Sequence, residues 1–296
     1  MLLLAALWGG SFFFMRASSA DFGPAGFMFV RTALAAICLS PFFLSRRNFI
    51  FLIKRAPALS FIGLFGTALP FCLLSYAALT LSAGITGVLN STTPFFTLLV
   101  ALVWMGQKTT LLQVIGIFLG LLGVGMMSAE NFAANPQGVI LAVLAGLGAA
   151  LNYGVSTNFI KHYMQDIPSR VLASGSMLFA ALWLLPFAIW LWPAEKIPVD
   201  AWVNVSLLAI LSTAIAYLIF YDLVARVSAV AATSVIFVVP AFATFWGWLF
   251  LSEKLSWLML SGMTLSLIGT SMTIGLWQRK RGRERCNAAG PRASKP

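Results

Sequence analysis

The segment Thr92-Thr93-Pro94-Phe95-Phe96 has a counterpart in Val238-Val239-Pro240-Ala241-Phe242, 146 positions further along the chain. Each proline lies in an apolar stretch of roughly 20 residues or more, the length that crosses a bilayer as a helix. The chain therefore contains an internal repeat. The residues that coincide at this register without a gap are Thr67, Ala68, Ser82, Ala83, Phe96, Lys108, Leu112, Gly116, Leu119, Leu121, Gly123 and Met126 with Thr213, Ala214, Ser228, Ala229, Phe242, Lys254, Leu258, Gly262, Leu265, Leu267, Gly269 and Met272.

Composition identifies a membrane protein. The 296 residues are 60% hydrophobic and only 9% charged, whereas a soluble domain has about 25% charged residues. The apolar runs are continuous rather than alternating, which favours helices over a β-barrel. We predict an all-α integral membrane protein with ten transmembrane helices, near 2–17, 24–45, 57–80, 84–105, 109–128, 137–161, 168–192, 202–224, 228–251 and 256–277.

The repeat divides these spans into two sets of five. The beginnings of the two sets also match, at a register of 145, where Leu7-Trp8-Gly9-Gly10-Ser11 lies over Asn152-Tyr153-Gly154-Val155-Ser156. A repeat with an odd number of spans must lie upside down relative to its copy. We therefore expect 1–130 and 131–278 to form two inverted five-helix repeats, with a substrate site near mid-membrane between them, as in secondary transporters.

The positive charge is distributed as expected for membrane topology. The formal net charge is +11, but the basic residues gather in a few connections and in the tail 279–296. This pattern predicts that both termini face the cytoplasm and that Lys108 and Lys254 lie on opposite sides. We expect the basic tail to be disordered, no nucleic-acid partner, and no cleaved signal peptide. The three cysteines and one histidine have no metal-ligand spacing, so we expect neither a metal nor a cofactor.

Two further spans carry small residues at helical spacing. Gly116 and Gly120 lie in the fifth span, and Gly262 and Ser266 in the tenth. Such faces allow close helix packing in lipid, so these spans could clamp the halves together. Glycine is also simply common in membrane helices, and the sequence does not decide between the two interpretations.

Several motifs resemble the EamA family of the drug/metabolite transporter superfamily, over most of the chain from about Leu4 to Leu276. They are Leu7-Trp8-Gly9-Gly10-Ser11-Phe12, Phe29-Val30-Arg31-Thr32, Thr92-Thr93-Pro94-Phe95-Phe96 with Gly106-Gln107-Lys108, and Val239-Pro240-Ala241-Phe242 with Leu251-Ser252-Glu253-Lys254. Gln107 departs from the family's usual glutamate. The resemblance implies ten helices in two inverted halves, alternating access, and export of metabolites, often amino acids, from the bacterial cytoplasm. It also implies a multi-pass protein of the bacterial inner membrane.

The two mid-span prolines are candidate hinges. A proline inside a helix removes one hydrogen bond and displaces the carbonyl four residues earlier, which belongs to Asn90 for Pro94 and to Ile236 for Pro240. A carbonyl without a partner costs several kcal/mol in lipid. Each kink is therefore a candidate for bending or binding, although a neighbouring helix could also satisfy the carbonyl in a static kink.

The candidate substrate-binding residues are polar or aromatic side chains within the spans, which should face the bundle interior. In span four they share one face, while the matching positions of span nine, including Ile236 and Val239, are apolar. This combination of a polar and an apolar wall suits a small zwitterion with a hydrophobic side chain. The full set is Trp8, Ser11, Thr86, Asn90, Thr93, Asn152, Tyr153, Ser156, Tyr217 and Tyr221.

Charges inside the spans are scarce. No Asp or Glu lies deep in a predicted span, and Arg31 is the one basic residue well inside. Arg31 could pair with helix-end carbonyls or with a substrate carboxylate. We therefore expect a substrate that is neutral overall, such as a neutral or zwitterionic amino acid, and a transporter that acts as a monomer among membrane lipids. No protease motif supports an enzyme. The alternatives within transport are an exporter of apolar drugs or other metabolites, and a lipid flippase.

Overall fold

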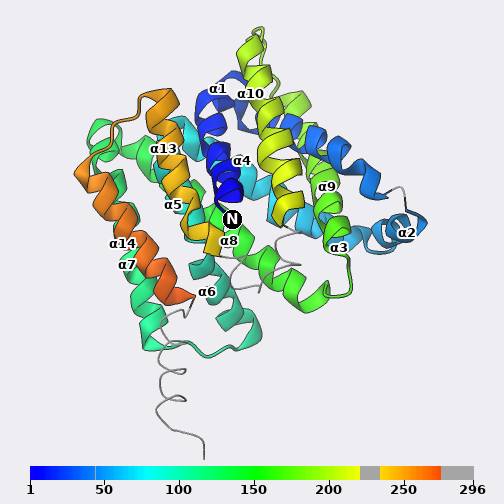
Figure 1. Ribbon diagram of the computed structural model, residues 1–296, viewed down its shortest axis with the longest axis horizontal. Coiled ribbons are helices and arrows are strands. Elements are labelled where there is room, and N and C mark those ends of the chain that lie inside the picture. The colour runs from blue at the N-terminus through cyan, green and yellow to red at the C-terminus, as the bar shows by residue number, and fades with distance from the viewer. Residues whose placement is uncertain (44, 221–233, 275–296) are drawn as a thin grey trace, which may run out of the picture.

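A computed structural model describes residues 1–43, 45–220 and 234–274 of the chain. Every regular element in these ranges is a helix, which confirms the all-α prediction (Figure 1). Seven of the described helical segments are long and apolar enough to cross a membrane. One of them, Leu2–Phe43, is 42 residues long and covers the first two predicted spans. A shorter apolar helical segment, Val235–Leu251, and a last helix, Trp257–Thr273, follow the seven. The tail 279–296 lies outside the described residues.

The elements of the first half run from the N-terminus to residue 134. They are α1 (Leu2–Leu39), η1 (Ser40–Phe43), α2 (Arg46–Lys54), α3 (Ala56–Gly63), η2 (Leu64–Ala68), α4 (Leu69–Thr80), α5 (Ala83–Ser91), α6 (Thr93–Met105) and α7 (Leu111–Ala134). The second half follows directly. It contains α8 (Pro136–Tyr163), α9 (Ser169–Trp190), α10 (Val199–Ala209), η3 (Ile210–Ile215), η4 (Ser234–Phe237), α13 (Val239–Leu251) and α14 (Trp257–Thr273).

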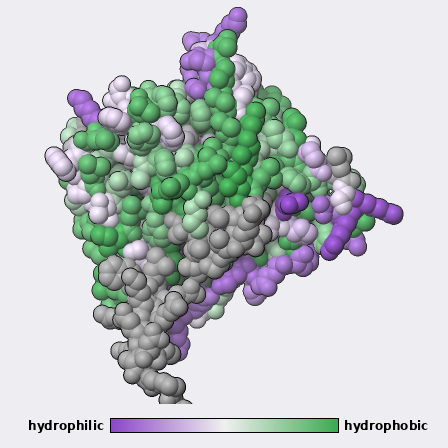
Figure 2. All heavy atoms as spheres, in the orientation of Figure 1, coloured by the Kyte–Doolittle hydropathy of each residue, from purple (hydrophilic) through white to green (hydrophobic). Residues whose placement is uncertain are grey.

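Two connections differ from the sequence expectation. The predicted gap between 17 and 24 is helical, because α1 continues to Phe22 and bends at Gly23, whose φ of 70° and ψ of 152° suit glycine. Pro24 follows and also favours extended backbone at Gly23. The connection after the second predicted span, which contains Arg46, Arg47 and Lys54, forms α2, an amphipathic helix that suits the membrane interface. Figure 2 shows hydrophilic residues at the edges of the molecule, over α2 and near the start of α10, with an apolar surface between them.

Local backbone features recur at the 146-residue register. A π-helical stretch occurs at η2, after α3, and again at η3, after α10. The helix α6 ends at a left-handed residue, Gly106 (φ 62°), and α13 ends at Ser252 (φ 53°). A π-helix is an uncommon backbone conformation, and so is a left-handed cap at a residue other than glycine, such as Ser252. Their recurrence therefore extends the sequence repeat to the local backbone.

The turns that follow α6 and α13 lie at opposite ends of the molecule. In Figure 1 the turn between α6 and α7 lies at the bottom of the bundle, and the turn between α13 and α14 lies at the top. These turns contain the repeat partners Lys108 and Lys254. The helices α7 and α14 consequently run in opposite directions along one edge of the molecule.

The glycine faces of α7 and α14 pack against each other, as one of the two interpretations above expected. A Cβ atom on Gly116 would lie 2.6 Å from the carbonyl oxygen of Gly269, and one on Gly262 would lie 2.6 Å from that of Gly123. Gly116 is the repeat partner of Gly262, and Gly123 is the repeat partner of Gly269. The contact therefore has the symmetry of two copies facing each other. Close backbone approach of this kind gives dispersion packing that no larger residue would allow.

A second pair of glycines joins the halves near the centre. Gly9 of α1 packs on the backbone of α13, where a Cβ atom would lie 2.9 Å from the nitrogen of Ala243. Gly154 of α8 packs on α6 in the same way, and a Cβ atom there would lie 2.8 Å from the nitrogen of Thr97. Each half therefore places its first helix against the fourth-span helix of the other half.

The sequence suggested that Pro94 and Pro240 kink continuous helices. In the structure each proline instead lies in the first turn of a separate helix. The chain breaks at Thr92, between α5 and α6, and Pro94 is at the beginning of the new helix. Pro240 likewise begins α13, after the short 3₁₀ helix η4. A proline is tolerated in the first turn of a helix, because the missing N–H would have no partner there. The carbonyl of Asn90 is not left bare, since the Thr93 hydroxyl donates to it at 2.7 Å.

Candidate functional site

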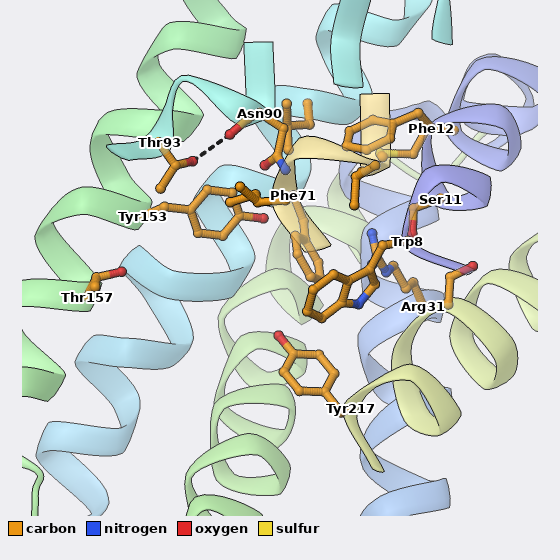
Figure 3. A pocket seen from close by; sticks show the side chains of 15 residues that line it. Trp8, Ser11, Phe12, Arg31, Phe71, Asn90, Thr93, Tyr153, Thr157 and Tyr217 are labelled. Carbon is orange, nitrogen blue, oxygen red and sulfur yellow. Dashed lines mark hydrogen bonds between the residues drawn. The ribbon is translucent and has the colours of Figure 1, made fainter. Parts of the chain in front are cut away.

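A cavity of about 240 Å³ lies at the centre of the molecule, between helices of both halves (Figure 3). The first half contributes residues of α1, α4, α5 and α6, and the second contributes α8, η3, η4, α13 and the helical residue Tyr217. The lining residues are Trp8, Ser11, Phe12, Met15, Arg31, Phe71, Leu74, Asn90, Thr93, Tyr153, Thr157, Ser212, Tyr217, Ile236 and Val239.

Most of these residues form pairs related by the sequence repeat. Trp8 and Phe12 of α1 match Tyr153 and Thr157 of α8 at the register of 145. At the register of 146, Phe71 matches Tyr217, Asn90 matches Ile236, and Thr93 matches Val239. The cavity therefore lies where equivalent surfaces of the two halves meet.

The chemistry of the paired positions is unequal. Asn90 and Thr93 give the first half an amide and a hydroxyl, whereas Ile236 and Val239 are aliphatic. Figure 3 shows the rings of Tyr153 and Tyr217 pointing into the cavity, with the Asn90 amide above them. Aromatic rings provide a large apolar surface, and tyrosine adds a hydroxyl at its edge. The arrangement can hold a small molecule that has both an apolar body and a few polar groups.

Arg31 is the charged residue of the cavity wall. It lies on the part of α1 after the Gly23 bend, and only 5% of its surface is exposed. Its Nε–H donates to the hydroxyl of Thr213 at 3.0 Å, and its Cζ lies 3.8 Å from the centre of the Phe71 ring. The π-helix η3 positions Thr213, while Phe71 follows the π-helix η2 through α4. Both π-helices thus contribute to the setting of one arginine.

Six of the ten predicted binding residues line the cavity. They are Trp8, Ser11, Asn90, Thr93, Tyr153 and Tyr217. The structure brings them together from five helical segments, as the inward-facing polar pattern had suggested. Their contact with a substrate stays a prediction. Tyr221, another member of the predicted set, lies outside the described residues.

Three predicted residues do not line the cavity. Thr86 is fully buried within the helix packing, and its hydroxyl donates to the carbonyl of Ser82. The amide of Asn152 donates to the carbonyl of Gly148 in its own helix. Ser156 is buried against Gly66 of the π-helix η2. Each of these side chains hydrogen-bonds within its own helix or packs in a contact between helices. This is the alternative to substrate binding for polar residues in membrane helices.

Several lining residues were not in the predicted set. Phe12, Phe71 and Leu74 are apolar, so nothing in the sequence distinguishes them from the many core residues of similar type. Thr157 and Ser212 carry hydroxyls, but their repeat partners, Phe12 and Gly66, are not in the predicted set and so do not identify them. Phe71 differs from these, because its repeat partner is the predicted Tyr217, just as Ile236 and Val239 are the partners of the predicted Asn90 and Thr93. Matching each predicted residue to its repeat partner would have found it.

The main described cluster of charges outside the cavity lies near the turn after α13. Glu253 accepts the N–H of Ala83, the first residue of α5, at 3.0 Å. Arg16 donates to the carbonyls of Ala78 and Leu79 at the end of α4, and its Nε lies 4.0 Å from a Glu253 oxygen. Burial raises the pKa of Glu253 above its ordinary 4.5, and the Ala83 bond and Arg16 only partly oppose this. Within the described ranges, no group of three or more His, Cys, Asp and Glu comes together.

An all-helical, multi-pass membrane protein with a cavity between its helices has the architecture of a membrane transporter. The comparison with known proteins identifies which kind. The chain belongs to the EamA-like transporter family, whose family model matches residues 1–129 and 140–275. This confirms the resemblance found in the sequence motifs and indicates a transport role rather than an enzymatic one.

Similar proteins include an uncharacterized transporter of Archaeoglobus fulgidus, 23% identical over 93% of this chain and 97% of that protein. The uncharacterized inner membrane transporter YedA of Escherichia coli is 28% identical over 90% of this chain and 88% of its own length. A probable terminal-alkyne amino-acid exporter of Streptantibioticus cattleyicolor is 25% identical, covering 92% and 91% of the two chains. A crystal structure of a protein that is 16% identical has the same fold, with a TM-score of 0.64 over 94% of this chain and 96% of the other.

Proposed function

We propose that the protein is a secondary transporter that exports small neutral or zwitterionic metabolites, in particular amino acids, across the bacterial inner membrane. Ten transmembrane helices would form two inverted five-helix repeats, 1–130 and 131–278. The repeats would expose one central cavity to each side of the membrane in turn. Both termini would face the cytoplasm, and the protein would act as a monomer.

The observation that carries this proposal is the pairing of the cavity residues. Equivalent positions of the two halves, such as Trp8 with Tyr153 and Phe71 with Tyr217, meet around one space. A site on the axis between inverted repeats can be opened to either side by equivalent movements of the halves. A channel or a structural protein would not need this arrangement.

The ten-helix layout is supported by how the described helices divide. The segment Leu2–Phe43 bends at Gly23 and contains two predicted spans. The shorter α13 and α14 begin 146 residues after α6 and α7. The turns after α6 and α13 lie at opposite ends (Figure 1), as two inverted copies require.

The chain breaks support alternating access. The gap at Thr92 separates α5 from α6, and η4 precedes α13 at the matching place. Pro94 and Pro240 favour a break at these points, because neither has an N–H to donate to the preceding turn. Broken helices near mid-membrane are where transporters bind and bend. We therefore retain both prolines as hinges.

The cavity chemistry favours an amino acid as substrate. At two matched positions its wall offers the Asn90 amide and the Thr93 hydroxyl from the first half, and the aliphatic Ile236 and Val239 from the second. The described lining contains no carboxylate, which disfavours a substrate with a net positive charge. The name of the Streptantibioticus cattleyicolor relative, a probable amino-acid exporter, points in the same direction.

The second candidate is an exporter of apolar drugs or other metabolites, or a lipid flippase. One observation favours it. A second, mainly apolar groove of about 380 Å³ lies between α1, α10 and α13, and it shares Ser212 with the central cavity. An apolar molecule could pass from the bilayer to the cavity along this route.

A counterflow assay over the twenty amino acids, with protein in proteoliposomes, separates the two candidates. We expect uptake of uncharged amino acids, with large apolar or aromatic ones favoured. Asn90→Ala should reduce uptake by about tenfold, the loss of roughly one good hydrogen bond to a buried group. Asn152→Ala, the matched control, removes an amide that bonds its own helix and should leave uptake unchanged. Transport of a hydrophobic drug without any amino acid would support the second candidate.

A further inference from the structure

The side chain that the cavity chemistry leaves unexplained is Arg31. Two ion pairs occur within the described ranges, Arg16 with Glu253 and Arg55 with Asp166, and neither involves Arg31. A charge held inside a membrane protein is costly unless it is paired, and such residues usually mark a pathway or binding site. Arg31 is buried, lies on the cavity wall, and has no carboxylate partner in the described part of the chain.

The guanidinium group is held firmly on two sides. The Thr213 hydroxyl accepts its Nε–H at 3.0 Å and itself donates to the carbonyl of Leu208 at 3.0 Å. The direction of the Thr213 hydroxyl is therefore fixed, with a lone pair toward Arg31. The Phe71 ring covers one face of the group at 3.8 Å, a favourable cation–π distance. A preorganised arginine loses little freedom when a ligand binds.

The other edge of the guanidinium is available for a ligand. Its remaining bond runs from Nη1 to the Met28 sulfur at 3.9 Å, which is long and weak. Among the described residues, the fully buried side-chain nitrogen or oxygen atom without a hydrogen-bond partner is Ser266 Oγ. The terminal nitrogens of Arg31 are therefore not both fully buried and without a partner. Figure 3 shows Arg31 reaching into the cavity beside Trp8 and Ser11, with Tyr153 and Asn90 across the space. The open N–H groups therefore face the volume that a substrate would fill.

From this geometry we infer that Arg31 binds the carboxylate of the transported molecule. The inference rests on the proposed transport function and narrows its substrate to compounds that carry a carboxylate. The terminal N–H pair of arginine matches a carboxylate in geometry and charge. One arginine suits one negative charge, and the aromatic walls suit an apolar side chain. The ammonium group of an amino acid would then lie toward the Asn90 amide and the Tyr153 hydroxyl.

The test measures binding to the purified full chain in detergent by ligand-induced thermal stabilisation. The probes are L-phenylalanine, its amide, 2-phenylethylamine and 3-phenylpropionate, with chloride and inorganic phosphate as simple anions. L-Phenylalanine and 3-phenylpropionate have the carboxylate, while the amide and the amine do not. We expect the two carboxylates to bind and the other probes to bind at least about tenfold more weakly, since a charge-assisted bond is lost.

Variants then assign the effect to Arg31. Arg31→Gln should weaken both carboxylates at least about tenfold and remove the preference for L-phenylalanine over its amide. Arg31→Lys should retain part of the preference, because it keeps the charge but not the planar pair of donors. Arg55→Gln is the matched control, since it removes an exposed arginine that pairs with Asp166, and it should bind as the wild type does. Thr213→Val keeps Arg31 but removes its anchor, so it tests the inference if Arg31→Gln does not fold.

The outcomes separate the inference from the proposed function. Equal binding of L-phenylalanine and its amide by the wild type overturns the carboxylate site, and so does a preference that survives in Arg31→Gln. Binding of chloride or phosphate in place of the carboxylates overturns it as well. Binding of 3-phenylpropionate with no amino acid bound or transported keeps the carboxylate site and rejects the amino-acid function. Transport of amino acids that is unaltered in Arg31→Gln keeps the amino-acid function and rejects the carboxylate site.

Discussion

The two halves share a backbone plan and differ in the side chains that they present to the cavity. At matched positions the first half has Asn90 and Thr93, while the second has Ile236 and Val239. Arg31, at the cavity wall, also belongs to the first half. The repeat thus preserves the helix crossings and the chain breaks, which in the proposed transport mechanism would let the halves move alike. The chemistry that selects a substrate is free to diverge, since a small asymmetric molecule needs different partners at its two ends.

The turns after α6 and α13 differ in a similar way. Glu253 packs beside Arg16 and accepts the N–H of Ala83, with only 12% of its side chain exposed. Gln107 is its repeat partner and is exposed, and Lys161, the partner of Arg16, is exposed as well. The turn after α13 is therefore tied to α4 and α5 by charged side chains, whereas the turn after α6 has the exposed Gln107 at the matching position. The position matching Ala83 lies outside the described residues.

The largest effect should come from breaking the symmetric helix contact. A Cβ atom on Gly123 would lie 2.7 Å from the backbone nitrogen of Ser266, too close for either helix to accommodate without moving. We expect Gly123→Ala to destabilise the protein by about 1–3 kcal/mol, as overpacking does. Gly125→Ala on the same helix has open space around it and should be nearly neutral. Thermal unfolding in detergent measures both, and equal stability of the two variants would contradict the packing.

A smaller effect should follow from making the two cavity walls alike. Ile236→Asn gives the second half the amide that Asn90 gives the first. We expect uptake of large apolar amino acids to fall by about tenfold relative to small polar ones, because one apolar contact of this size contributes roughly 1–3 kcal/mol to discrimination. Ile236→Val keeps the wall apolar and should retain the wild-type order of substrates. Competition in the counterflow assay gives that order, and an order that stays unchanged in Ile236→Asn would remove the apolar wall from the account.

The smallest effect concerns the pH dependence of stability. Because burial raises the pKa of Glu253 above 4.5, the folded protein holds this proton more tightly than the unfolded chain does. The contribution of Glu253 is therefore fully present below pH 4.5 and is lost as the pH rises through the raised pKa. Glu253→Gln should flatten this fall in the unfolding temperature.

Asp166 provides a control of opposite sign. Its bond with Arg55 lowers the pKa of the exposed carboxyl, so its contribution is present above the ordinary 3.8 and is lost as the pH falls. Asp166→Asn should therefore change only the acidic end of the profile, and weakly. If Glu253→Gln instead steepens the fall above pH 4.5, the buried position of this carboxyl is wrong.

Much of the fold could be predicted because its determinants are periodic. The length of each apolar stretch predicts a membrane span, and identical residues 146 positions apart predict the repeat, including the glycines of α7 and α14. The sequence could not foresee that the chain breaks at Thr92 before Pro94, because a proline fits either an interior kink or a first turn. Nor could the sequence show that the connection before Gly23 is helical, because its polar residues Ser18, Ser19 and Asp21 are typical of a loop.

The candidate site was predictable only in part. Polar and aromatic residues such as Tyr153 and Asn90 stood out against an apolar background. Thr86 and Ser156 did so equally, yet helix rotation places them in packed contacts, and the sequence alone does not give that rotation. Phe71 shares its type with many core residues, so only its repeat partner Tyr217 marks it. The role of Arg31 depends on which neighbours surround it, and that is a tertiary property.

The central claim is that both halves contribute to one substrate site, and cysteine protection tests it most directly. Thr93→Cys and Val239→Cys would be made singly, at matched positions of the two halves, after the native Cys38, Cys72 and Cys286 are replaced by serine. The rate of labelling by a thiol reagent would be measured with and without the best-transported amino acid. The account predicts that the amino acid slows labelling at both positions. Slowing at one position only, or at neither, would contradict a site shared by the two halves.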